Sequence, residues 1–418
     1  MDQTVPINTL KKRSQTRINL QLRKISMGLL AVLPILAWYK IPFPVGLGYA
    51  LVLFLSAYVI LKKNFKISVV PYSFWIMVGY VCVMWIYHNN FSFKSLFPPG
   101  GWRFFIFLLA VIWGVISFDS RLLQKYMRWI VLISIGLFWI QIILKMLYGS
   151  NVICFVPNLT GAFTYEDMTY SELAAHQIHG SSPSSIFLEK SYMAYYLIAY
   201  LAITWFRNRD RDILVNKEII IIGCTLIALR SGSGMIGLAI LGITKVFVIF
   251  KDAKLRRRIT ILTVLIPILI GGVTYFAKSQ IGEALISRSD EFSNEGSSGF
   301  DRVVGGYLMF ATLNSKEKLI GISDPADKFG TVTSPGKVKF YVNGLQTVLL
   351  TLGYIGALVY LLFYSSLFVR VELSSKMCII VLLILSLLES NYLNPYMMLL
   401  TIIPCASYYR NKLDLVSK

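Results

Sequence analysis

The sequence has few charged residues for its length. Asp, Glu, Lys and Arg make up 15% of the 418 residues, whereas soluble globular proteins average about 25%. The hydrophobic fraction is 56% and the mean hydropathy is +0.63. This composition excludes an ordinary water-soluble domain. It predicts a membrane protein, because many stretches approach the roughly 20 apolar residues that one transmembrane helix needs.

Acidic residues, cysteine and nucleotide-binding motifs are also scarce or missing. The chain has 21 Asp and Glu against 41 Lys and Arg, a formal net charge of +20. In a membrane protein such an excess reflects cytoplasmic loops, so nucleic acid is not an expected partner. The five cysteines show no metal-ligand spacing, and the chain contains no Walker motif and no dinucleotide fingerprint. The sequence therefore predicts no zinc site, no cofactor and no ATP-driven pump.

Long apolar segments dominate what is present. We count about 12 of them, which predicts an all-α, polytopic transmembrane helix bundle of about 12 spans. The segments cover residues 26–40, 44–61, 67–88, 103–119, 129–148, 190–206, 218–231, 234–250, 259–277, 341–369, 377–390 and 395–409.

The positions of Lys and Arg predict the orientation of these spans. With the N-terminus inside, every second loop is short and basic, as the positive-inside rule requires of cytoplasmic loops. We therefore expect both termini to be cytoplasmic. The expected organisation is a basic N-terminal segment at 1–25, a transmembrane domain at 26–409 and a cytoplasmic tail at 410–418.

Two of the expected outer loops are long, at about 149–189 and 278–340. Loops beyond about 12–15 residues are usually functional or disordered. The second is expected to be partly ordered, because the stretch from Val303 to Leu313 is amphipathic. In the first, His176 and His179 are one helical turn apart. They are candidate sugar contacts, since a third metal ligand is not evident.

Charged residues beside the spans are candidates for chemistry. Arg230 lies in Leu229-Arg-Ser-Gly-Ser-Gly234 at the outer end of a span. Its guanidinium could grip a diphosphate with the amides of a helix break, or it could snorkel to the interface and cap a helix. Glu189 could act as a general base or pair with Lys190. Glu389 ends an apolar span and is a candidate partner for an arginine.

Residues in the second outer loop add further candidates. Arg302, in Gly299-Phe-Asp-Arg302, and Arg288 are either phosphate or sugar contacts or ordinary solvated loop residues. Tyr341 beside this loop could stack on a sugar ring, although membrane interfaces enrich tyrosine in any case.

Over about residues 185–370 the chain resembles the bacterial O-antigen polymerase and O-antigen ligase superfamily. Local patterns of that family occur in its order. They are Phe187-Leu-Glu-Lys-Ser-Tyr-Met-Ala-Tyr-Tyr196, Leu229-Arg-Ser-Gly-Ser-Gly234, Ser298-Gly-Phe-Asp-Arg302 followed by Leu319-Ile-Gly-Ile322, and Val342-Asn-Gly-Leu-Gln346 followed by Leu352-Gly-Tyr-Ile-Gly356.

The chain departs from the family pattern in places. Lys190 replaces the usual proline, and Val342 stands where the ligases have a histidine. The second departure favours a polymerase over a ligase. Polymerases are also described with arginine-x10-glycine patterns in two outer loops. Arg288 and Gly299 fit this pattern once, but the first outer loop contains no arginine.

The resemblance implies a GT-C-like fold and a polymerase of undecaprenyl-diphosphate-linked repeat units, for O-antigen, capsule or a related surface polysaccharide, on the outer face of the inner membrane. The expected partners are the lipid-linked glycan donor and acceptor, membrane lipid and a chain-length regulator. The alternatives are an O-antigen ligase, and a flippase or secondary transporter of the same glycan. The resemblance carries over Arg230, Arg302, Asn343 and Glu189. Together with the candidates from the loops, the expected catalytic residues are Arg230, Arg302 and Glu189, and the expected substrate contacts are Arg288, Asn343, Tyr341 and His179.

Overall fold

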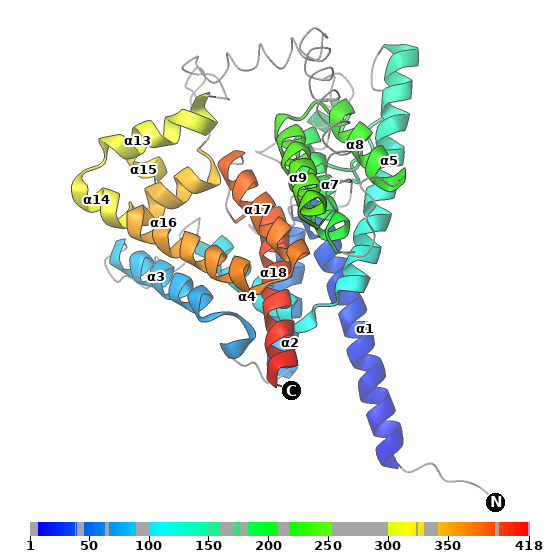
Figure 1. Ribbon diagram of the computed structural model, residues 1–418, viewed down its shortest axis with the longest axis horizontal. Helices are drawn as coiled ribbons and strands as arrows, with labels where there is room; N and C mark the ends of the chain where they lie inside the picture. Colours follow the sequence, from blue (N-terminus) through cyan, green and yellow to red (C-terminus); the bar gives the residue numbers. More distant parts are fainter. Residues whose placement is uncertain are drawn as a thin grey trace, which may run out of the picture.

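The computed structural model describes fourteen stretches of the chain, and these are helical with no β-strand (Figure 1). They comprise residues 7–37, 39, 46–62, 67–88, 101–149, 153–158, 171–172, 174–175, 183–207, 217–252, 300–322, 325–329, 342–388 and 393–416.

A helix occupies each predicted apolar segment that lies in these ranges; the segment 259–277 lies outside them. The long helices are α1 (Ile7–Leu36), α2 (Leu47–Lys62), α3 (Tyr72–His88), α4 (Gly101–Ser117), α5 (Ser120–Tyr148), α7 (Lys190–Trp205), α8 (Lys217–Ala228), α9 (Gly232–Asp252), α16 (Gly344–Arg370), α17 (Leu373–Leu388) and α18 (Pro395–Val416). The short ones are η1 (Ile67–Val69), η4 (Asp301–Gly305), α13 (Gly306–Thr312), α14 (Ser315–Ile320) and α15 (Pro325–Phe329).

Several of these helices have the character of membrane helices. Among the described residues, α5, α9 and α16 are long and apolar enough to cross a membrane, and shorter apolar helices include α2, α3, α4 and α17. The all-α class predicted from the sequence is therefore confirmed, and the apolar helices are consistent with a membrane protein. Helix α5 begins earlier than its predicted span, because the Asp119 carboxylate accepts hydrogen bonds from the Arg121 and Leu122 amides at 3.0 Å.

Helix α7, like α18, is deeply buried in the bundle. Every residue from Tyr192 to Ile203 is buried. The helix contacts α5, α8, α9, α17 and α18. A helix that is apolar on all sides must be enclosed by other helices. The bundle is therefore built around α7, with α5, α8 and α9 gathered on one side and α3 and α16 further away (Figure 1).

Small residues set the direction of α9 relative to α7. A Cβ atom added at Gly234 would lie 2.8 Å from Cβ of Ala194, and one at Gly237 would lie 2.3 Å from Cδ1 of Ile198. These contacts advance in the same direction along both helices, so α9 runs parallel to α7. The N-termini of the two helices therefore lie at the same end of the bundle.

Two side-chain contacts align α5 with α8. Arg128 Nε donates to Glu218 Oε1 at 3.3 Å, and Trp139 Nε1 donates to Thr225 Oγ1 at 3.1 Å. Both helices therefore advance in the same direction.

The backbones of α14 and α16 are in close contact at Gly321 and Gly353. Gly353 (φ +66°) interrupts α16, and Gly321 (φ +82°) ends α14. The Ile322 amide donates to the Leu350 carbonyl at 2.8 Å. A Cβ atom at Gly353 would come within 2.4 Å of the Leu319 carbonyl oxygen. Only glycine allows this approach and this backbone conformation together.

The amphipathic stretch predicted from Val303 to Leu313 is helical, as expected. It forms the end of η4 and helix α13. Its buried side chains pack into a small apolar cluster against α16, made of Met309, Phe310, Leu313, Ile322 and Leu350.

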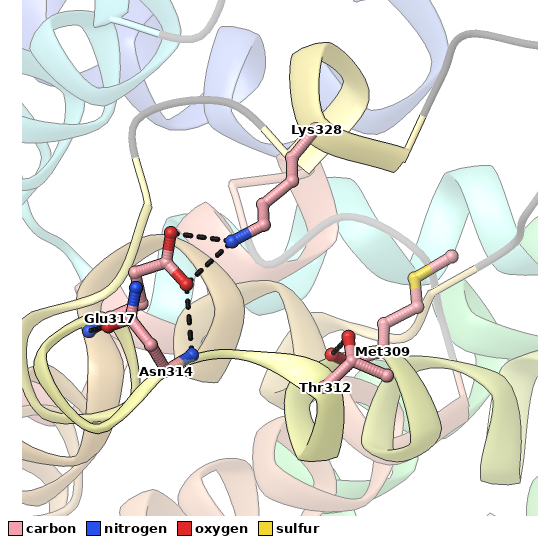
Figure 2. A network of polar contacts seen from close by, with 5 residues as sticks. All are labelled: Met309, Thr312, Asn314, Glu317 and Lys328. Carbon is pink, nitrogen blue, oxygen red and sulfur yellow. Dashed lines mark hydrogen bonds and ion pairs between the residues drawn. The ribbon is translucent and has the colours of Figure 1, made fainter.

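Polar contacts tie the short helices α13, α14 and α15 together (Figure 2). Thr312 Oγ1 donates to the Met309 carbonyl at 2.7 Å. Asn314 caps α14 in a reciprocal box with Glu317, in which each side chain accepts from the other residue's amide, at 2.9 and 3.0 Å. Lys328 Nζ, from α15, donates to both Glu317 carboxylate oxygens at 2.5 and 2.6 Å. Glu317 therefore joins α14 to α15.

The kink in α16 yields a first prediction. Gly353→Ala should destabilise the protein by roughly 2 kcal/mol or more, because the left-handed conformation costs about 1–2 kcal/mol for a residue with a Cβ and the new methyl would press on backbone atoms. The matched control is Gly79→Ala in α3, where a Cβ atom would meet nothing within 4 Å. Thermal unfolding in detergent measures both variants. A Gly353→Ala protein as stable as wild type would contradict the argument.

The Glu317–Lys328 pair yields a second prediction. The hydrogen bonds from Lys328, and next the Asn314 amide, lower the pKa of Glu317 below its usual value of 4.5. A lowered pKa in the folded state stabilises it at pH above the usual value, and this contribution is lost as the pH falls through the lowered pKa. Amide exchange in α14 and α15, corrected for its intrinsic pH dependence, should rise on acidification. Lys328→Met should already show high exchange at neutral pH, and an unchanged wild-type profile would exclude the pair as the link.

Candidate functional site

Buried hydrogen bonds hold the segment that leads into α7. Gln141, buried in α5, accepts from the Ser185 amide at 2.8 Å and donates to the Ile153 carbonyl at 3.1 Å. Ser184 Oγ donates to the Phe187 carbonyl at 2.7 Å. Ser185 itself is left-handed, with φ +58°. This network was not predicted from the sequence, although a glutamine inside an apolar span was its signal.

Glu189 is the N-cap residue of α7. Its backbone is extended (φ −135°), and within the described chain its side chain makes no capping hydrogen bond to the α7 amides. Instead its Oε2 accepts from Ser191 Oγ at 3.2 Å. The residue is partly exposed. Its carboxylate is therefore partly accessible at the start of α7 and is not used to cap the helix.

Arg230 occupies the break between α8 and α9 and is left-handed, with φ +50°. Its amide donates to the Ile227 carbonyl at 3.1 Å, while its side chain is exposed. The guanidinium has no hydrogen bond or ion pair to any described residue. The next residue, Ser231, is buried, and its Oγ lies 3.1 Å from Ser233 Oγ. The break therefore presents a guanidinium with its donors available.

The parallel packing of α7 and α9 brings these features to one end of the bundle. Glu189 precedes α7, and Arg230 precedes α9. In the described part of the chain, the non-glycine residues with positive φ are Ser185 and Arg230, one before each of these two helices. Each left-handed residue costs about 1–2 kcal/mol, and such residues cluster at functional sites. The candidate site is therefore the shared N-terminal end of α7 and α9.

Aromatic side chains pack under this end. Tyr192, one turn after Glu189, stacks on Tyr396 with ring centroids 5.9 Å apart. Tyr195 meets the same ring edge-on at 5.8 Å. Asn394 Oδ1 accepts from the Tyr396 amide at 2.7 Å and so starts α18. The site thus rests on packed aromatic rings that periodicity along one helix could not reveal, since α18 supplies one of the three.

Asn343 has a structural role. It is buried and caps α16 in a box with Gln346: its Oδ1 accepts from the Gln346 amide at 2.8 Å, and Gln346 Oε1 accepts from the Asn343 amide at 3.0 Å. Gln346 Nε2 then donates to the Val303 carbonyl at 3.0 Å. A Cβ atom at Gly306 would lie 2.6 Å from the Gln346 amide carbon. The Asn343–Gln346 box therefore holds η4, which contains Arg302, against the start of α16.

Helix α17 contacts η4, which contains Arg302, and also the two helices that follow Glu189 and Arg230. Segment η4, whose backbone includes Arg302, contacts α17, and α17 packs against both α7 and α9. The segment η4 that includes Arg302 therefore contacts the same helix as α7 and α9, the helices that follow Glu189 and Arg230. The candidates Arg288, Tyr341, His176, His179 and Glu389 lie outside the described residues.

The chemistry that this arrangement permits is anion binding and proton transfer. A guanidinium binds phosphate oxygens with charge-assisted hydrogen bonds, and a carboxylate can accept a proton from a hydroxyl group. Among the described residues, no group of three or more His, Cys, Asp or Glu side chains is placed to hold a metal ion.

The comparisons with known proteins add no relative. No family model matches the chain, and no curated protein matches it. The resemblance to the O-antigen polymerase and ligase superfamily therefore rests on the order of its local motifs.

Proposed function

We propose that this chain polymerises undecaprenyl-diphosphate-linked oligosaccharide repeat units by inverting glycosyl transfer. The observation that carries the proposal is the exposed, left-handed Arg230, which has no partner among the described residues and lies at the same end of the bundle as Glu189. A cation kept in a strained conformation without an internal partner suits an anionic ligand. A diphosphate is the anion that the local motifs indicate.

The proposal includes a membrane arrangement of about 12 spans with a GT-C-like fold, in a bacterial inner membrane with both termini in the cytoplasm. The start of α7 and α9 then faces outward. The opposite end of α7 carries Arg207 and adjoins Arg121, Lys125 and Arg128 of α5. This distribution supports the orientation, because arginine and lysine accumulate at the cytoplasmic ends of spans.

The proposed reaction joins two lipid-linked glycans without a nucleotide sugar. Glu189 accepts the proton of an acceptor hydroxyl, whose oxygen attacks the anomeric carbon of the donor glycan. The bond between that carbon and the diphosphate oxygen breaks, and undecaprenyl diphosphate leaves with the electron pair. Arg230 and Arg302 bind the diphosphate and stabilise the charge that develops on it. The glycosyl bond is already activated by the diphosphate, so the reaction needs no ATP, metal or other cofactor.

The remaining candidate residues bind the glycan or its diphosphate, or position residues that do. Arg288 is a second phosphate or sugar contact, and Tyr341 and His179 contact sugar rings. Asn343 contributes through the position of η4 described above. A chain-length regulator remains a proposed partner of the outer loops.

Substitutions at Arg230 test the proposed function in a strain that lacks the native protein. Arg230→Gly and Arg230→Ala should both slow polymerisation by roughly 10- to 150-fold, because a charge-assisted contact contributes about 1.5–3 kcal/mol. Arg230→Gly should fold at least as well as wild type, since glycine relieves the left-handed strain. Arg230→Lys should restore activity only in part, because an ammonium lacks the planar fork. Polymer length on gels and protein level in membranes are measured together.

The control for the Arg230 series is Arg410→Ala, which removes an exposed arginine at the C-terminal part of α18 and should leave polymer length unchanged. Full-length polymer with Arg230→Gly would contradict diphosphate binding by Arg230 and leave this residue only a helix-capping role.

The lipid-linked material that accumulates in the strain identifies which reaction step the protein performs. Single repeat units indicate a polymerase, and long lipid-linked polymer indicates a ligase. Repeat units that stay on the inner face indicate a flippase.

The double variant Arg230→Ala/Arg302→Ala should lose less activation free energy than the sum of the two single losses, since both arginines act on one leaving group.

Cysteine labelling tests the orientation. In a chain without its five native cysteines, Glu295→Cys should react with a membrane-impermeant maleimide added to intact spheroplasts, because it lies in a proposed outer loop. Asn208→Cys, in the basic loop after α7, should react only after the membrane is permeabilised. The reverse labelling pattern would place the α7 and α9 N-termini inside and remove the basis for an outer-face reaction.

A further inference from the structure

At the opposite end of α7 from Glu189, basic residues line a cavity of about 620 Å³ between α5, α7 and α8. Helix α5 supplies Arg121, Gln124, Lys125 and Arg128 from its first turns. Helix α7 and the residues after it supply Tyr200, Leu201, Thr204, Trp205 and Arg207, and α8 supplies Glu218, Ile219 and Ile222. We call this cavity the basic pocket.

The basic pocket carries a large excess of positive charge. Four described lining residues are cations and one is a carboxylate, which leaves a net charge of +3. The carboxylate, Glu218, is already engaged: Tyr200 Oη donates to it at 2.6 Å, and Arg128 Nε donates to it at 3.3 Å. The side chains of Arg121 and Lys125 have no hydrogen bond or ion pair to any described residue. Among the described lining residues, therefore, no counter-charge is paired with these two cations.

The spacing of the cations on α5 makes the excess of positive charge destabilising. Arg121, Lys125 and Arg128 are at positions i, i+4 and i+7 of α5, so they form one stripe along the helix. Like charges at such spacing repel by about 0.2–0.5 kcal/mol per pair. The positive-inside rule accounts for basic residues in a loop, but it does not require them to converge on one cavity from two chain segments. An anion in the pocket removes the repulsion.

Arg207 is held in place across the mouth of the basic pocket. Its Nη1 donates to the Ser120 carbonyl at 3.4 Å and to the Gln124 side-chain oxygen. A guanidinium has five N–H donors, so others remain for a ligand. Trp205 lines the same cavity, and its buried indole nitrogen has no hydrogen-bond partner among the described residues. Arg207 therefore adds a fixed guanidinium to the charges of Arg121 and Lys125.

Helices α5 and α8, which line the basic pocket, also expose apolar side chains. Leu132 follows Arg128 on the same stripe of α5 and is exposed, and α8 exposes Ile220 and Ile221 beside Glu218. Trp129, next to Arg128, is 60% exposed, as is common for tryptophan at the headgroup level of a membrane. Exposed apolar side chains on α5 and α8 therefore lie next in sequence to residues that line the basic pocket.

We infer that the basic pocket binds the phosphate headgroup of an anionic phospholipid of the cytoplasmic leaflet, with its acyl chains along α5 and α8. Basic pockets between transmembrane helices on the cytoplasmic side are suited to such headgroups. The bound lipid would neutralise the α5 stripe and tie α5, α7 and α8 together. This binding function is separate from the proposed polymerisation and stands or falls without it, although it does use the proposed orientation.

Lipid titration of the purified full-length protein tests the inference. Binding of dioleoylphosphatidylglycerol is measured by native mass spectrometry, with dioleoylphosphatidylcholine in parallel. Phosphatidylglycerol should bind more tightly than phosphatidylcholine. Arg121→Gln/Lys125→Gln/Arg128→Gln should weaken phosphatidylglycerol binding by roughly 100-fold (about 2.8 kcal/mol), because each cation close to an anionic lipid contributes roughly a fivefold factor.

A matched triple variant controls for general surface charge. Lys251→Gln/Arg370→Gln/Lys376→Gln removes three cations from other elements at the same end of the bundle and should change binding by less than about threefold. If the pocket triple is unstable, Arg121→Gln/Lys125→Gln keeps the Arg128–Glu218 pair and should weaken phosphatidylglycerol binding by roughly 20-fold. Equal losses in both triples, or equal binding of the two lipids, would overturn the inference. Displacement of phosphatidylglycerol by equimolar inorganic phosphate would assign the pocket to a soluble anion and overturn the lipid assignment.

Discussion

The enclosure of α7 is the constraint on which the rest of the structure depends. Twelve consecutive residues, from Tyr192 to Ile203, are shielded from solvent by neighbouring helices. The direction of α7 then determines where its two polar termini emerge. At the first, Gln141 of α5 holds the Ser185 amide. At the second, the buried Lys245 of α9 donates to the Trp205 carbonyl at 2.7 Å, which satisfies a terminal carbonyl that α7 cannot pair internally.

The polar features of the protein collect at these two termini for a physical reason. The flank of α7 offers no exposed surface, and an unpaired polar group there would cost several kcal/mol. Helix ends have backbone groups without intrahelical partners, so polar and charged side chains are compatible with them. The start of α7 carries Glu189 with the Arg230 break beside it, and its end carries Arg207 with the basic pocket beside it. One helix thus positions the candidate site at its first end and the basic pocket at its second.

Local sequence signals predicted the helices. Features that depend on contacts between residues distant in the sequence were not predicted. Apolar runs located α16 and α17, because burial in a helix bundle or a membrane requires such runs. The left-handed conformation of Arg230 could not be predicted, because it follows from the packing of α9 on α7 through Gly234. The basic pocket also needed the fold, since Arg128 and Arg207 are far apart in the sequence. The capping role of Asn343 was predictable: an asparagine followed three residues later by glutamine is a capping-box pattern.

The role of Asn343 changes how the motifs of the second half of the chain are interpreted. A family-like asparagine beside an outer loop suggests a sugar contact, but its side-chain oxygen accepts from the Gln346 amide and its backbone amide donates to Gln346. Gln346 in turn reaches the Val303 carbonyl, and Gly306 leaves room for it. The Gly321–Gly353 contact anchors the other end of the same segment to α16. These residues therefore act on the position of Arg302. A loop arginine becomes a useful ligand for a diphosphate only when its backbone is held in this way, because ordering a free loop would consume much of the free energy of binding.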